Sequence, residues 1–190
     1  MNTARREVRK ALPGEAAALS TLAQRSKAHW GYSPEFMRAC QAELTYNCQE
    51  IVDYPFYVLH SGARLIGFYA LRPRSAAQVE LEALFVEPEF IGTGCGRALI
   101  AHAKTTAAAL GFRELIVQGD PNAVAFYEAA GGTPIGSRES ASVCGQIPAA
   151  VLHSAARCRP FPARNCLPKG VTKPSASLRR TIWRCGRADC

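Results

Sequence analysis

EPEFIGTGCGRALIAHA, residues 87–103, places three glycines at alternate positions directly before a predicted helix. These are Gly92, Gly94 and Gly96. Backbone N–H groups in the first turn of a helix lack intrahelical partners and lie at the positive end of its dipole, so main chain alone can bind a phosphate there. Glycine permits that close approach and the positive φ angles of such a loop. Glycine-rich turns also precede helices that bind nothing, so the loop alone does not establish a site.

Two other phosphate-binding motifs do not fit this loop. In a P-loop the last glycine is followed by Lys and then Ser or Thr, whereas Gly96 is followed by Arg97 and Ala98. A dinucleotide fingerprint belongs to an early βαβ unit, whereas several predicted strands precede this loop. The sequence therefore predicts neither of these nucleotide-binding folds.

Apolar patterns on both sides of the loop predict a chain that mixes strands and helices. Ser33 and Pro34 are typical of the start of a helix, and Gly111 is typical of the end of one. We predict strands at residues 6–10, 56–60, 65–71, 79–86, 114–118 and 133–138, and helices at residues 13–28, 34–44, 99–110 and 123–130.

The strand at residues 79–86 leads into the glycine loop. A side-chain period of two places Glu80, Glu82, Leu84 and Val86 on one face of it. That face would mix carboxylates with apolar groups.

The composition predicts one globular domain, because the chain has 190 residues of which 48% are apolar. No apolar run reaches the roughly 20 residues that cross a bilayer. The first residues, MNTARREVRKALPGE, lack the apolar segment of a secretory signal. We therefore expect a cytoplasmic protein with no membrane partner, whose cysteines are free thiols.

The net charge of +8 comes entirely from residues 141–190. Residues 1–140 hold 14 basic and 14 acidic residues, whereas residues 141–190 hold nine basic residues against Asp189. This segment lacks the repeated basic-aromatic spacing of a nucleic-acid site, so we do not expect a nucleic-acid partner. We predict a folded domain at residues 1–140 and a disordered basic tail, rich in Cys, Pro and Arg, at residues 141–190.

EPEFIGTGCGRALI, followed about 25 residues later by NAVAFYEAAGG, resembles the acetyl-CoA-binding core of the GCN5-related N-acetyltransferase (GNAT) family. The family's loop reads Q/R-x-x-G-x-G/A. Gly94 and Gly96 match it, Gly92 is the common extra glycine, and Ile91 stands where Gln or Arg is usual. The resemblance covers about residues 5–140. It implies the GNAT acyl-CoA N-acyltransferase fold, an α/β (α+β) fold with a central, mostly antiparallel sheet flanked by helices.

The resemblance also implies transfer of the acetyl group of acetyl-CoA to a primary amine by direct attack, without a metal. The amides of residues 92–97 would hold the pyrophosphate, and the main chain of residues 84–86 would pair with the pantetheine arm. Because the loop binds through backbone, Ile91 would weaken or reorient binding more than abolish it. The implied cofactor-binding residues are Leu84, Phe85, Val86, Ile91, Gly92, Thr93, Gly94, Cys95, Gly96, Arg97 and Asn122.

Three residues are candidates for catalysis. Tyr127 matches the family's tyrosine that can protonate the departing thiolate. Direct transfer needs an unprotonated amine, so a carboxylate or an ordered water is expected near the attacking nitrogen. Glu80 and Glu82 are candidates for that base, although exposed strand carboxylates are often only solubilising. We expect Cys95 to be a packing residue and not a nucleophile.

The segment His29-Trp30-Gly31-Tyr32 resembles the part of the family that closes over the acceptor. His29, Trp30 and Tyr32 are therefore candidate acceptor-binding residues, and the aromatic rings could form an amine-binding wall. The sequence does not distinguish a small-molecule amine from a protein amine, and it does not indicate the oligomeric state.

The family's last strand is not recognisable in SVCGQIPAAVLHSAARCRPFPARNC. Degenerate codons for residues 145–153, read after dropping the first base, can encode Gly-Arg-Tyr-Leu-Pro-Leu-Phe-Phe-Ile, which is the kind of strand the family has there. We therefore hypothesise that residues from about 144 onward are translated out of the ancestral frame. A lost strand would expose a sheet edge and part of the acceptor pocket. The alternatives to an active enzyme are then an impaired or non-catalytic CoA-binding protein, or a polyanion-binding module.

Sequencing of the gene tests the frame hypothesis. We expect that a single-base shift near codon 144 restores an apolar strand of the family's type. Intact reading frames on both sides, with no single-base shift that does so, would remove the hypothesis.

Overall fold

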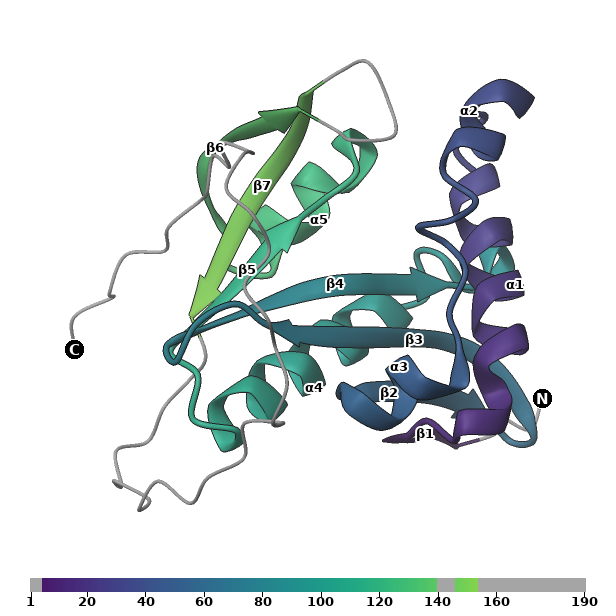
Figure 1. The fold of residues 1–190 in the computed structure, drawn as a ribbon, viewed down its shortest axis with the longest axis horizontal. Helices are drawn as coiled ribbons and strands as arrows, with labels where there is room; N and C mark the ends of the chain where they lie inside the picture. Colours follow the sequence, from purple (N-terminus) through teal and green to yellow (C-terminus); the bar gives the residue numbers. More distant parts are fainter. Residues whose placement is uncertain (1–4, 140–145, 154–190) are drawn as a thin grey trace.

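A mixed sheet of seven strands runs through residues 5–139 and 146–153, the part of the chain that this computed structural model describes (Figure 1). The strand order is β1-β2-β3-β4-β5-β7-β6, and the neighbours are antiparallel except for the parallel pair β4 and β5. The predicted α/β fold with a mostly antiparallel sheet is therefore confirmed. The strands are β1 (Arg6–Lys10), β2 (Phe56–Ser61), β3 (Arg64–Pro73), β4 (Gln78–Val86), β5 (Glu114–Gln118), β6 (Thr133–Glu139) and β7 (Gln146–His153).

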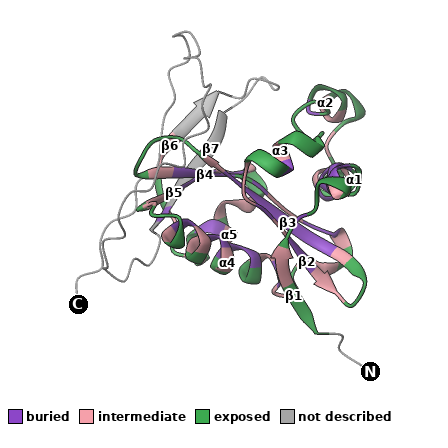
Figure 2. Ribbon diagram, turned by 60° about the horizontal axis from the view of Figure 1, so that its bottom comes forward, coloured by how far each residue is buried: buried purple, intermediate pink, exposed green. Residues whose placement is uncertain are grey.

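Helices cover both faces of this sheet. Neighbouring residues of β3 belong to two different clusters: Phe68 packs with α1 and α3, whereas Tyr69 packs with α4 and α5. Buried residues run along β3 and β4 between the two helical layers (Figure 2). In the described residues, no helix is both long and apolar enough to span a bilayer. The helices are η1 (Pro13–Glu15), α1 (Ala16–Ala28), α2 (Pro34–Ala39), α3 (Cys48–Asp53), η2 (Pro88–Phe90), α4 (Cys95–Ala109), η3 (Pro121–Ala123) and α5 (Val124–Ala129).

Helix α2 begins where predicted and ends earlier than predicted. The Ser33 side chain accepts a hydrogen bond from the Phe36 N–H, and Pro34 is the first helical residue. The helix ends at Ala39 and not at about residue 44, because residues 40–44 form turns in which the Leu44 N–H still bonds the Cys40 carbonyl. Those turns keep the apolar spacing that suggested a longer helix.

Helix α3 was not predicted, although its start carries a local signal. The Asn47 side chain accepts from the Glu50 N–H at 3.0 Å, and the Glu50 side chain accepts from the Asn47 N–H at 3.0 Å. This reciprocal capping box satisfies two N–H groups that the first turn leaves open.

A β-bulge in β4 corrects the predicted faces of that strand. Ala70 pairs with Ala83 and the next residue of β3, Leu71, pairs with Leu81, so Glu82 is an extra residue on β4. Leu81 consequently packs on the α4 side, while Ala83 packs on the α1 side. The expectation that Glu80, Glu82, Leu84 and Val86 share one face is therefore wrong.

The strand β7 corrects the expectation that no strand follows residue 141. It lies between β5 and β6, pairing with β5 from Ala149 to His153 and with β6 from Gln146 to Val151. The edge of β5 is therefore covered along its whole length, and the predicted loss of activity through an exposed edge has no basis there. The frame hypothesis started from the apparent absence of a strand in this segment, and β7 removes that argument for it. The rest of the predicted tail, residues 154–190, lies outside the described residues.

Gly67 on β3 is the position where a side chain would disturb the sheet most directly. An added Cβ would lie 2.9 Å from the Phe85 carbonyl oxygen and 3.0 Å from Leu99 Cδ1. We expect Gly67→Ala to lower the free energy of unfolding by about 1–3 kcal/mol, because the core has no room for a methyl group there. Urea denaturation followed by circular dichroism measures this.

Gly14→Ala is the matched control, because a Cβ on Gly14 would meet nothing within 4 Å. Its free energy of unfolding should stay within about 0.5 kcal/mol of that of the wild type. Equal stability of both variants and the wild type would contradict the predicted packing of β3 against β4 and α4.

Candidate active site

A cleft opens where β4 and β5 separate. Their parallel ladder ends at the pair Leu81 and Val117, and no strand in the described ranges pairs with residues 82–86 on that side. Figure 1 shows the two strands diverging from this point. The cleft between them has a volume of about 720 Å³. It brings together most of the predicted site residues, namely Trp30, Tyr32, Glu82, Leu84, Phe85, Val86, Ile91, Gly92, Gly94, Gly96, Arg97, Asn122 and Tyr127.

The three loop glycines serve two different purposes. Gly92 and Gly94 have φ angles of 79° and 86°, which residues with a side chain rarely adopt. Gly96 is needed for a different reason, because a Cβ there would lie 3.1 Å from the ring of Phe126 on α5. Gly94 caps α4 without a side chain, so the first N–H groups of a 15-residue helix open onto the cleft.

Thr93 and Cys95 support this loop from the side away from the cleft. The Cys95 side chain is buried, and its Sγ lies 3.3 Å from Thr93 Oγ1. The Arg6 guanidinium on β1 donates to the Thr93 carbonyl at 2.8 Å, a contact the sequence gave no reason to expect. None of the three cysteines among residues 5–139 forms a disulfide.

Tyr127 carries a buried hydroxyl that no other described residue contacts by a hydrogen bond. Its residue is 8% exposed and lines the cleft, and none of the hydrogen bonds within the described residues reaches the hydroxyl. Burial raises the pKa of Tyr127, and the charge of Asp120 raises it further. Gly119 makes room for the ring, since a Cβ there would lie 2.8 Å from Tyr127 Cε2. The sequence analysis missed this role of Gly119, which only the folded chain reveals.

The two candidate carboxylates of β4 are in different environments. Glu80 is 6% exposed, forms an ion pair with Arg74, and is not among the residues that line the cleft. Glu82, the bulge residue, lines the cleft and forms an ion pair with Arg72. The structure therefore brings Glu82 to the site, and it does not bring Glu80 there.

Aromatic side chains from the region around α2 also line the cleft. Tyr32 stacks on Phe36 with ring centroids 4.1 Å apart, and Trp30 also lines the cleft. His29 is exposed and contacts Trp30 edge to face, but it is not among the lining residues. Of the three predicted acceptor-binding residues, the structure thus places Trp30 and Tyr32 in the cleft.

Asp120, in the segment after β5, connects that segment to α1 and to the loop that follows α1. Its carboxylate accepts hydrogen bonds from Lys27 Nζ on α1 at 2.8 Å and from the Tyr32 hydroxyl at 2.7 Å. It also accepts from the Asn122 N–H at 3.0 Å and from Asn122 Nδ2 at 2.9 Å. Asn122 Nδ2 lies 3.1 Å from the Tyr32 hydroxyl as well. The sequence analysis did not predict this bridge.

These contacts shift two pKa values. Burial raises the pKa of Tyr32 to about 12, and its hydrogen bond to Asp120 adds to the effect. Burial works against the charge of Asp120, but the hydrogen bonds from Lys27, Asn122 and Tyr32 outweigh it and lower the pKa of that carboxyl. The bridge is therefore charged at neutral pH. In the described residues, no group of three or more His, Cys, Asp or Glu side chains could hold a metal ion.

Comparisons with known proteins agree with this architecture. The family model described as an acetyltransferase (GNAT) domain matches residues 31–145. The structure of PaiA N-acetyltransferase from Thermoplasma acidophilum, solved with coenzyme A, is similar with a TM-score of 0.64 at 22% identity. The similarity covers 78% of this chain and 99% of that one. The sequence matches no curated protein.

Two further solved structures share the fold. N-acetylglutamate synthase from Neisseria gonorrhoeae, complexed with coenzyme A and N-acetyl-glutamate, has a TM-score of 0.59 at 20% identity, over 80% of this chain and 35% of that one. The yncA protein from Salmonella typhimurium, solved with acetyl-CoA, has a TM-score of 0.59 at 16% identity, over 84% of this chain and 99% of that one.

The Asp120 bridge predicts a pH-dependent stability. The pKa of Asp120 is lower in the folded protein than its ordinary value of 3.8, so its ionised form stabilises the fold above that pH. This contribution to stability is lost as the pH falls through the pKa that Asp120 has in the folded protein. We expect Asp120→Asn to lower the free energy of unfolding by about 1–3 kcal/mol at pH 7, with the difference shrinking below about pH 4.

Denaturation at a series of pH values measures this difference. Asp53→Asn, at an exposed position of α3, is the control and should change the free energy of unfolding by less than about 0.5 kcal/mol. Equal free energies of unfolding for Asp120→Asn and the wild type at pH 7, or a difference between them that grows as the pH falls, would contradict the stabilising role of ionised Asp120.

Proposed function

Since the chain belongs to the acetyltransferase (GNAT) family, whose model matches more than half of it, we propose that it transfers the acetyl group of acetyl-CoA directly to a primary amine. The acceptor is a small molecule or a protein amine. Direct attack needs no acetyl group on the enzyme, so the buried Cys95 has no chemical part in it. A cytoplasmic location belongs to the same proposal.

The residues present fit acetyl-CoA. The glycine-capped start of α4 offers N–H groups to a diphosphate, and Arg97 adds a positive charge on the cleft side of the same turn. The backbone of residues 82–86 lacks a described strand partner toward the cleft, so it can pair with the amide-bearing pantetheine arm. Ile91 lines the cleft without offering a donor, which leaves the diphosphate to main chain and Arg97.

The Tyr127 hydroxyl is the observation that carries the proposal. It is buried, it lacks a described hydrogen-bond partner, and it lines the cleft beside the unpaired edge of β4. An unpaired hydroxyl of this kind is unfavourable for stability alone. Its raised pKa keeps it protonated at neutral pH, so it can donate its proton to the thiolate that leaves when the amine attacks.

Glu82 is the carboxylate placed to receive the proton that the amine loses. It lies at the point where β4 leaves β5, and Arg72 binds its Oε2. Within the described residues no hydrogen bond reaches its other oxygen, Oε1, which is therefore available to the acceptor or to a bridging water. Glu80 lies outside the cleft lining and takes no part in this scheme.

Tyr127→Phe tests the proposed acid. The change removes only the hydroxyl, so we expect kcat for coenzyme A release to fall by roughly a hundredfold. The Kd for acetyl-CoA, measured by calorimetry, should stay the same. The free energy of unfolding should change by less than about 0.5 kcal/mol, because no described partner is lost.

Tyr57→Phe is the matched control, since Tyr57 is on β2 and does not line the cleft. Undiminished turnover by Tyr127→Phe would overturn the role of Tyr127. A wild-type protein that binds acetyl-CoA and acetylates no amine would instead support the alternative, a CoA-binding protein without catalysis.

A further inference from the structure

Charged groups of both signs line the cleft. Arg97 and the start of α4 present positive charge. The carboxylates that line the cleft are Glu43, in the segment between α2 and α3, Glu82 on β4, and Asp120 after β5. An acceptor that approaches Glu43 and Glu82 meets negative charge.

The cations near these carboxylates already form ion pairs with acidic side chains. Arg72 contacts both Glu82 and Glu50, and its guanidinium lies 4.3 Å from the centre of the Tyr54 ring. Lys27 bonds Asp120. Within residues 5–139, none of the ion pairs involves Glu43. Among the described residues, one carboxylate of the cleft therefore has no ion-pair partner, and a second shares its partner Arg72 with Glu50.

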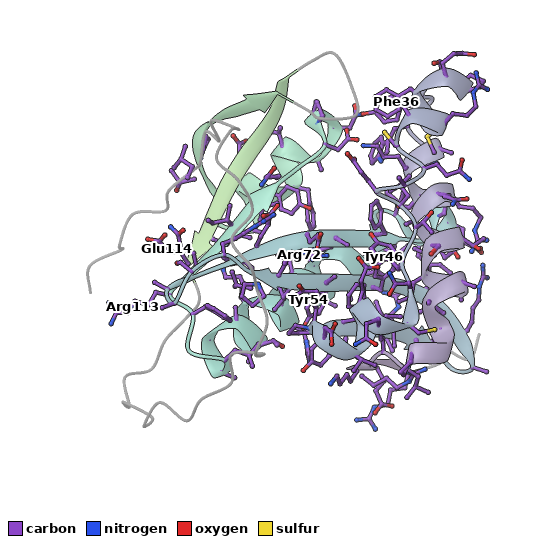
Figure 3. All side chains as sticks on the ribbon, in the orientation of Figure 1. Phe36, Tyr46, Tyr54, Arg72, Arg113 and Glu114 are labelled. Carbon is purple, nitrogen blue, oxygen red and sulfur yellow. The ribbon has the colours of Figure 1, made fainter. Side chains whose placement is uncertain are left out.

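The pKa of Tyr46 is affected by the charges of these carboxylates. It is in the segment between α2 and α3, lines the cleft, and lies near Arg72 (Figure 3). Burial raises the pKa of Tyr46, and the charges of Glu82, Glu50 and Glu43 raise it further, while Arg72 opposes them. Negative charge therefore outweighs positive charge around this ring.

The aromatic side chains of the cleft can also hold a cation. Lys27 Nζ lies 5.0 Å from the centre of the Tyr32 ring and 5.4 Å from that of Phe36. Trp30 and Tyr46 also line the cleft and have no cation of this kind among their described contacts. Tyr46 is the ring on which the charges of Glu43 and Glu82 act, and a ring next to carboxylates forms a favourable site for an ammonium or guanidinium group.

We propose that the acceptor is a compact dication, whose reacting amine lies beside Glu82 and whose second cationic nitrogen binds Glu43 against Tyr46. This inference rests on the proposed function and names the substrate class of the same site. The cleft of about 720 Å³ must also hold the pantetheine arm, so the acceptor part of it suits a short alkyl diamine. An acceptor with a carboxylate in place of the second nitrogen is disfavoured by the same charges.

The test compares three acceptors with the same alkyl chain: cadaverine, pentylamine and aminovaleric acid. With saturating acetyl-CoA at fixed pH and low salt, we expect kcat/KM for cadaverine to exceed that for pentylamine by about tenfold, which corresponds to one charge-assisted contact. Aminovaleric acid should be the poorest of the three. Added salt should reduce the preference, because it screens the exposed Glu43.

Glu43→Gln identifies the residue responsible. We expect it to reduce the ratio of cadaverine to pentylamine to about twofold or less, since it removes the charge and keeps the size. Glu7→Gln, on the exposed face of β1 and outside the cleft lining, is the matched control and should keep the ratio of the wild type.

The outcomes separate the two levels of the proposal. Equal kcat/KM values for cadaverine and pentylamine in the wild type overturn the inference and leave the acetyltransferase activity in place. A preference for cadaverine that survives Glu43→Gln overturns the assignment of Glu43. Acetylation of none of the three acceptors overturns the inference, whereas the proposed function is overturned separately, by the absence of acetyl-CoA binding in calorimetry.

Discussion

The parallel ladder between β4 and β5 stops at Leu81 and Val117, and the rest of the site depends on the gap that follows. Beyond this point β4 and β5 each remain hydrogen-bonded to the neighbour on their other side. β3 pairs with β4 as far as Val86, and β7 pairs with β5 as far as Gln118. The two strands can therefore separate without leaving the sheet. The bulge at Glu82 lies directly after the last pair, where a local increase in twist favours the separation.

The gap becomes a specific site because its two walls are joined at defined points. Asp120 links α1 and the following loop to the segment after β5, through one ion pair and hydrogen bonds to Tyr32 and Asn122. Glycine at 96 lets α4 approach Phe126, and glycine at 119 lets β5 approach the Tyr127 ring. The glycine-capped start of α4, the edge of β4 that has no described partner and the buried Tyr127 hydroxyl thereby line one space, which suits the proposed binding of a thioester with a diphosphate tail.

Local signals in the sequence predicted most of the elements and many of the residues that line the cleft. The alternate glycines, the Ser33-Pro34 start of α2 and the apolar periods depend only on neighbours along the chain, so they could be identified without the fold. The bulge at Glu82 depends on the register with β3, and the bridge at Asp120 depends on Lys27, which is 93 residues away. Strand β7 was missed because QIPAAVLH does not alternate polar and apolar residues, and its place between β5 and β6 comes from pairing.

Calorimetric titration of the full chain with acetyl-CoA and with acetyl-pantetheine tests the central claim most directly. We predict one site for acetyl-CoA, and at least roughly tenfold weaker binding of acetyl-pantetheine, which lacks the diphosphate that the start of α4 would hold. Absence of binding by acetyl-CoA, or equal affinity for the two compounds, would contradict it.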